Sequence, residues 1–266
     1  MMKSIALGID MPDDFPTEAH NEVVEKLGAA PSKSEIGGEL AAGWNAVAIR
    51  FKSTATADEG YRRSVSSKAA LGSFDELVVQ QEALFAFFMN GYAAIESFAY
   101  AVFALGAMLR LVDFPMNTEA NRQTIDLRKA KSAFAATFSR TAIEARLSAL
   151  VVDPKFDQWG RIRNVLAHRA QPPRRHDITV GRTTPDKTVW EITDGLTIDH
   201  QTTASRRSWL AAKLGECITG SCRFCNREFC PGMTKRRGYA TTPTSPWANF
   251  SWSSSALGNS CVDARP

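Results

Sequence analysis

Residues 84–109 read L-F-A-F-F-M-N-G-Y-A-A-I-E-S-F-A-Y-A-V-F-A-L-G-A-M-L, a stretch long and apolar enough to cross a membrane. Asn90, Glu96 and Ser97 lie inside it, and a charge near the membrane centre costs about 2.5–3.5 kcal/mol. Lysine and arginine are nearly absent from its flanks, with Arg110 as the exception. We therefore predict that this stretch is a buried helix of a bundle and that the protein does not associate with a membrane.

The apolar stretch belongs to a longer predicted helix with well-marked ends. Ser73 followed by Glu76 fits a capping box, in which the two side chains satisfy free backbone amides at the helix start. The helix should run from 74 to about 111, because the chain must leave helical geometry before Pro115. Further helices are predicted near 126–137, at 141–151, from Pro154 after an Asp153 cap to before Pro172, and at 203–216.

The pattern changes between the last two helices. The segments 178–182 (I-T-V-G-R) and 188–192 (T-V-W-E-I) alternate around a Pro-Asp turn, which predicts a β-hairpin. The fold class expected is therefore an all-α bundle with a small β-hairpin between its last two helices. We divide the chain into an N-terminal polar segment with one or two helices (1–72), the bundle (73–216) and a cysteine-containing, disordered tail (217–266).

The cysteines lie close together near the end of the chain. None occurs in the first 216 residues, and four form the pattern C-x4-C-x2-C-x4-C, namely Cys217, Cys222, Cys225 and Cys230. This is not a disulfide framework, and with no apolar signal segment at the N-terminus it indicates a reducing, cytoplasmic setting. Four thiolates suit zinc, but the spacing is compact, and a disordered or non-native tail is the preferred reading. We predict no cofactor and no metal.

Charge is concentrated in one segment. The net charge of +4 is mild, but residues 158–176 hold five arginines and two histidines with no acidic residue. Within that segment, 161–169 read R-I-R-N-V-L-A-H-R on a well-capped helix. At 100° per residue, one arc of this helix is apolar, and Asn164 and His168 share the opposite face with Arg161. Arg163 falls at the edge of the apolar arc, about 140° from His168.

An arginine four to six residues before a histidine occurs about once by chance in such a chain, so the context must support the motif. The sequence R-N-V-L-A-H at 163–168, in a helical bundle whose earlier long helix carries Q-Q-E-A-L-F-A-F-F-M-N-G-Y-A-A-I-E-S-F at 80–98, resembles the HEPN superfamily over about 75–215. The resemblance implies a HEPN-like bundle that dimerises so that two motif helices line one cleft. It also implies a metal-independent endoribonuclease, in a toxin or defence system with an antitoxin or regulatory partner.

The residue types suit that chemistry. RNA carries its own nucleophile, His168 can exchange a proton near neutral pH, and Arg163 can stabilise charge on the phosphate. Asn164 would orient His168 or hold a phosphate oxygen. Glu96, a carboxylate in an apolar helix, either pairs with Arg163 and completes the catalytic set or faces solvent or a structural arginine. The residues expected to hold the RNA backbone are Arg161, Arg169, Arg174 and Arg175.

Two other functions stay open. A HEPN-like module without catalytic activity would bind nucleic acid, nucleotide or a partner protein, and salt-sensitive RNA binding without cleavage would favour it. A zinc-dependent binding protein would require metal at the four cysteines.

Overall fold

The computed structural model describes residues 3–28, 35–66, 73–168, 172–177, 179–180, 187–193 and 195–229. The described chain is mostly helical, with two small antiparallel sheets. The helices are α1 (Thr17–Gly28), α2 (Glu35–Ser66), α3 (Phe74–Leu109), α4 (Glu119–Gln123), α5 (Leu127–Thr137), α6 (Ala142–Val151), α7 (Pro154–His168) and α8 (His200–Glu228). The strands are β1 (Lys3–Ser4), β2 (Asp10–Met11), β3 (Arg174–Asp177), β4 (Lys187–Thr193) and β5 (Leu196–Ile198).

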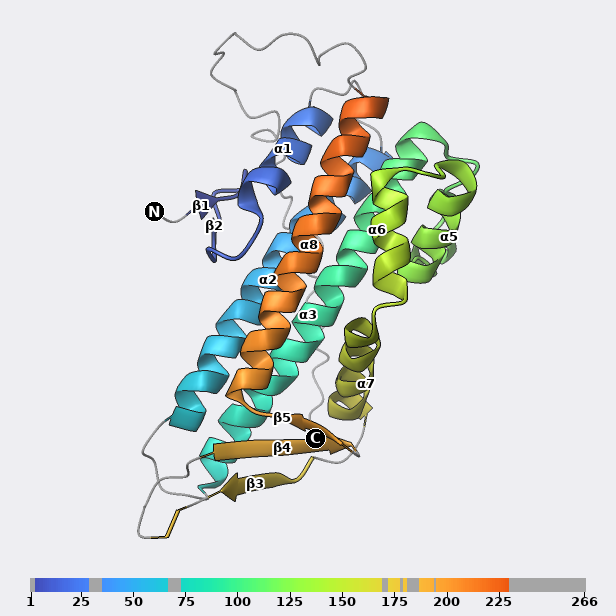
Figure 1. The fold of residues 1–266 in the computed structure, drawn as a ribbon. Coiled ribbons are helices and arrows are strands. Elements are labelled where there is room, and N and C mark those ends of the chain that lie inside the picture. Colours follow the sequence, from blue (N-terminus) through green and yellow to red (C-terminus); the bar gives the residue numbers. More distant parts are fainter. Residues whose placement is uncertain are drawn as a thin grey trace, which may run out of the picture.

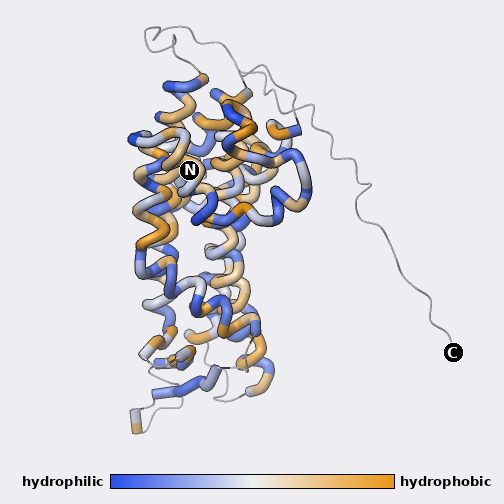
Figure 2. The backbone as a smooth tube through the Cα atoms, turned by 90° about the vertical axis from the view of Figure 1, so that its right-hand side faces the viewer, coloured by the Kyte–Doolittle hydropathy of each residue, from blue (hydrophilic) through white to orange (hydrophobic). Residues whose placement is uncertain are grey.

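Three long helices, α2, α3 and α8, lie side by side and form the body of the bundle (Figure 1). Along the α2–α3 contact, a Cβ atom built on Gly43 would lie 3.1 Å from the Tyr100 ring and 3.2 Å from Ala101, so glycine permits a close approach. The shorter helices α5, α6 and α7 cover the α3 side, and the β3–β5 sheet closes the lower end (Figure 1). Hydrophobic and hydrophilic residues alternate along the helices (Figure 2), as expected when one face of each is buried.

The long apolar helix is the centre of this core. Among the described helices α3 alone is long and apolar enough to span a membrane, and 61% of its most apolar window is buried inside the protein. This supports the interpretation of residues 84–109 as a buried bundle helix. The cytoplasmic location stays a prediction.

The predicted helix starts are confirmed because their signals are local. The Ser73 side chain accepts a hydrogen bond from the Glu76 amide at 3.1 Å, and α3 begins at Phe74. Asp126 accepts from the Lys129 amide at 2.7 Å at the start of α5. Asp153 accepts from the Lys155 amide at 2.9 Å, where α7 begins.

The predicted hairpin is present, but its first strand was placed too late. β3 covers Arg174–Asp177 rather than 178–182 and pairs antiparallel with β4, with Arg174 opposite Trp190. Arg174 also reaches the bundle, where its Nη1 donates to Gln80 Oε1 at 3.2 Å, and these tertiary contacts fix the register. A third strand, β5, was not predicted. Residues 178 and 181–186 lie outside the described part of the chain.

The prediction that a disordered tail begins at residue 217 is also wrong. α8 continues to Glu228, and Cys217, Cys222 and Cys225 are buried on its inner face. Cysteine behaves there as a small apolar residue, so the helical pattern of the core continues through the cysteine-containing segment. Residues 230–266, including Cys230, lie outside the described residues.

The N-terminal segment contributes to the same core as the later helices. Trp44, Phe51 and Tyr61 of α2 are fully or almost fully buried and belong to the hydrophobic cluster that also contains the α3 and α8 residues. The one or two helices predicted within residues 1–72 are present as α1 and α2, and α2 extends to Ser66.

Candidate functional site

The motif helix α7 has the two faces that its sequence predicts. Trp159, Ile162 and Val165 are buried against the bundle. Arg161, Asn164 and His168 are exposed and follow one another at helical spacing, with Asp157 one turn before them. We call Arg161, Asn164 and His168 the α7 stripe, which presents an arginine, an amide and an imidazole to solvent on one line.

Arg163 is not part of the α7 stripe, because its side chain lies against α3. Its guanidinium carbon lies 5.7 Å from the centre of the Tyr92 ring, within the range of a cation–π contact. The other contact of that ring is Phe156, which stacks on it at a centroid distance of 5.3 Å and an angle of 5°. Arg163 Nη1 also donates to Asn164 Oδ1 at 3.0 Å, so the arginine links the Tyr92 contact to the α7 stripe.

Glu96 lies one turn after Tyr92 on α3, where α3, α5 and α7 meet. Burial, reinforced by the negative charge of Asp126, raises the pKa of Glu96 to about 7. Hydrogen bonds from the Leu127 amide and the Tyr92 side chain, and the charge of Arg163, act in the opposite direction. Among the described residues Glu96 and Arg163 form no ion pair, so the predicted pairing is reduced to a weak interaction of their charges, and Glu96 accepts a hydrogen bond from the Leu127 amide at the start of α5.

Glu96→Gln tests this environment through its pH dependence. The folded-state pKa of Glu96, about 7, lies above the ordinary value of 4.5. The contribution of protonated Glu96 to stability is therefore complete below pH 4.5 and is lost as pH rises through 7. Between pH 5 and pH 8, the free energy of unfolding of the variant should therefore rise by about 2 kcal/mol relative to that of the wild type. This figure is already reduced to allow for the partial exposure of Glu96. Urea denaturation at both pH values measures this. Glu82→Gln, at an exposed position on α3, should show no such gain, and an equal response of the two variants would contradict the buried state of Glu96.

The arginines predicted to hold RNA differ in their surroundings. Arg161 is exposed on the α7 stripe. Arg174 is half-buried against Gln80, and Arg175 forms ion pairs with Asp177 at 3.1 Å and Glu191 at 2.9 Å. Arg169 lies outside the described residues. The charge of Arg175 is thus balanced within the sheet, whereas that of Arg161 lies beside Asn164 and His168.

Tyr92 is the residue of this site that the sequence analysis missed. Its ring contacts both Phe156 and Arg163, and its pKa is raised by burial and by the charge of Glu96. Its position four residues before Glu96 on the same helix face was the available signal. Its partners on α7, however, are set by tertiary packing that no local pattern reports.

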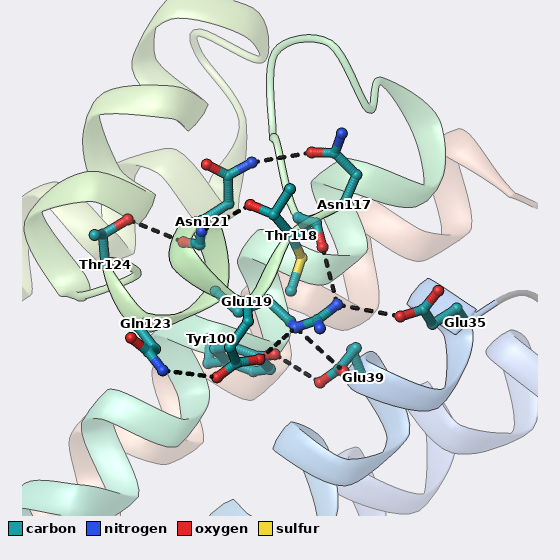
Figure 3. Close-up of polar contacts among 11 residues, drawn as sticks. Glu35, Glu39, Tyr100, Asn117, Thr118, Glu119, Asn121, Gln123 and Thr124 are labelled. Carbon is teal, nitrogen blue, oxygen red and sulfur yellow. Dashed lines mark hydrogen bonds and ion pairs between the residues drawn. The ribbon is translucent and has the colours of Figure 1, made fainter.

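A second polar cluster lies where α2 begins. Arg122 forms ion pairs with Glu35 at 3.2 Å, Glu119 at 3.1 Å and Glu39 at 3.8 Å, and the Tyr100 hydroxyl donates to Glu39 at 2.6 Å (Figure 3). These contacts join α2, α3 and α4 around one arginine, and we interpret them as a structural brace. In the described part of the chain, no three histidine, cysteine or acidic side chains are grouped so that they could hold a metal ion.

A scan against protein-family models, a search of curated proteins and a search of solved structures found no match.

Proposed function

We propose that this protein is a HEPN-like, metal-independent endoribonuclease that acts as a homodimer, with α7 as its motif helix. The observation that supports this most is the exposure of Asn164 and His168 on one face of α7, with Arg163 joined to Asn164 by a hydrogen bond of 3.0 Å. A proton-transfer group, an amide and a phosphate-binding group thus lie on one short helix. The resemblance of R-N-V-L-A-H to the HEPN motif supplies the reaction class.

The reaction proposed is transesterification within RNA. The 2′-oxygen attacks the adjacent phosphorus while the 2′-proton passes to a neutral His168, and the bond from phosphorus to the 5′-oxygen breaks. A protonated His168 returns a proton to the departing 5′-oxygen. Arg163 stabilises the charge that develops on the phosphate oxygens, because its planar guanidinium presents several donors at once. The products are a 2′,3′-cyclic phosphate and a 5′-hydroxyl end.

The homodimer is implied by the HEPN resemblance, and the geometry of α7 is compatible with it. Arg163 and His168 are separated by five residues, or about 140° around α7, so one helix directs them to different sides. A two-fold contact between the exposed faces of two α7 helices would bring the arginine of one copy toward the histidine of the other, and such isologous contacts are the commonest. Arg161 would flank the cleft in this arrangement, and an antitoxin or regulatory protein would act by covering it.

One observation favours a second candidate, a module that binds RNA, nucleotide or protein without cleaving it. In the single chain, Arg163 is engaged by the Tyr92 ring and by Asn164, so it must move to reach a phosphate. If Arg163 keeps these contacts in the assembled protein, the exposed stripe can bind a phosphate backbone but lacks its stabilising group.

An RNA cleavage assay in excess EDTA separates the two candidates. The wild-type protein, shown to be folded and dimeric, should cleave single-stranded RNA and leave cyclic phosphate and 5′-hydroxyl ends. His200→Ala, a histidine at the start of α8 outside the site, should retain full activity. A folded dimer that binds a panel of RNAs with a steep salt dependence but cleaves none would contradict the nuclease and support the binding module.

A further inference from the structure

Arg206 lies inside the bundle, and no carboxylate among the described residues balances its charge. Arg206 of α8 is 7% exposed, and its Nη2 atom donates to the neutral Gln158 Oε1 at 3.1 Å. Its Nε and Nη1 atoms are buried and have no hydrogen-bond partner among the described residues. Burial alone accounts for the lowering of its pKa. A buried charge is rare unless it is paired, so this arrangement requires an explanation.

A second unpartnered donor belongs to a residue that packs on the same aromatic ring as this arginine. The indole Nε1 of Trp159, next to Gln158 on α7, is also buried and has no partner in the described part of the chain. The Trp159 ring lies 5.0 Å from the Phe88 ring, and the guanidinium of Arg206 lies 5.8 Å from the same ring. Arg206 and Trp159 therefore pack on one aromatic side chain of α3, and both bring N–H donors with no acceptor.

We propose that Arg206 and Trp159 bind a small monovalent inorganic anion, such as chloride, inside the contact of α3, α7 and α8. A positive charge surrounded by unpartnered N–H donors is the chemistry that an anion needs, and unsatisfied buried polar groups often mark a bound ion. The anion must be small, because Phe88 and Trp159 are completely buried and leave no route for a nucleic-acid phosphate. This site is independent of the α7 stripe and of the proposed nuclease.

The test is the dependence of stability on chloride. The unfolding midpoint of the full chain is measured while chloride replaces gluconate at constant ionic strength and constant sodium. Between about 5 and about 300 mM chloride, the wild-type midpoint should rise by about 3 °C, in proportion to the logarithm of the chloride concentration above the dissociation constant, because the anion binds only the folded state. Arg62→Met, at an exposed arginine on α2, should keep the whole shift.

Two variants locate the effect. Gln158→Glu places a carboxylate at the atom that accepts from Arg206, and this internal anion should abolish the chloride shift while the protein stays folded. Arg206→Met should abolish it as well, and chlorine NMR line broadening by the wild type should be absent from both variants. Equal midpoints of the wild type in chloride and gluconate would overturn the proposal. A full chloride shift in Gln158→Glu would overturn it even if Arg206→Met failed to fold.

Discussion

Replacing His168 with alanine is expected to lower the rate of RNA cleavage by about 10²–10⁴-fold, the usual contribution of a positioned acid–base group. His168 is exposed at the end of α7, so its removal should change the free energy of unfolding by less than about 0.5 kcal/mol. The loss should appear in kcat, because the histidine exchanges protons in the transition state and contributes little to holding RNA. Single-turnover cleavage in EDTA with saturating protein measures it directly.

The matched variants distinguish this role from a structural one. His200→Ala removes a histidine outside the site and should cleave at the wild-type rate. Arg161→Ala removes a charge from the α7 stripe, and should weaken RNA binding and its salt dependence while single-turnover cleavage at saturation is preserved. Unchanged cleavage by His168→Ala would show that the active-site assignment is wrong, even if the wild-type protein were confirmed as a nuclease.

The faces of α7 and the capped starts of α3, α5 and α7 could be predicted from the sequence because they depend on neighbours within one turn. The buried side of α7 and the exposed positions of Arg161, Asn164 and His168 follow from a period of 3.6 residues. The caps at Ser73 and Asp153 depend on amides two or three residues away. Such local signals keep their meaning whatever the rest of the chain does.

The features that could not be predicted depend on contacts between distant residues. Arg175 belongs to a basic segment in sequence, yet Glu191 of the neighbouring strand balances its charge. The contacts of Tyr92 with Phe156 and Arg163 depend on how α7 lies on α3. Cys217 and Cys225 looked like part of a tail or a metal site, and only their burial in the bundle shows that they continue a helix. In each case the partner is supplied by tertiary structure.

Trp159→Ala is expected to reduce the free energy of unfolding by about 4 kcal/mol, as for other large aromatic residues removed from a core. The Trp159 ring is completely buried and contacts Phe87 at 5.1 Å, Phe88 at 5.0 Å and Trp209 at 6.4 Å between centroids. The ring packs α7 against both α3 and α8, so its loss should also displace the α7 stripe. Urea denaturation measures the first effect.

Gly91 supplies a sharper test of how that ring is seated. A Cβ atom at Gly91 would lie 2.2 Å from Trp159 Cζ3 and 2.3 Å from Cη2, so the ring must shift although aromatic neighbours hold it. Gly91→Ala should therefore cost about 2 kcal/mol, despite the gain of about 1 kcal/mol that alanine brings to a helix interior. Gly60→Ala on α2, where the added atom meets nothing within 4 Å, should be neutral or stabilising.

The sign of the Gly91 effect should reverse when the ring is absent. In the Trp159→Ala background the added methyl group no longer collides with the indole, so Gly91→Ala should stabilise the protein by about 1 kcal/mol. The double-mutant cycle then yields a coupling of about 3 kcal/mol between a residue of α3 and a residue of α7, which only direct contact explains. Additive effects would mean that Trp159 does not rest on Gly91. The orientation of α7, and with it the exposed face that carries His168, would then have to be assigned anew.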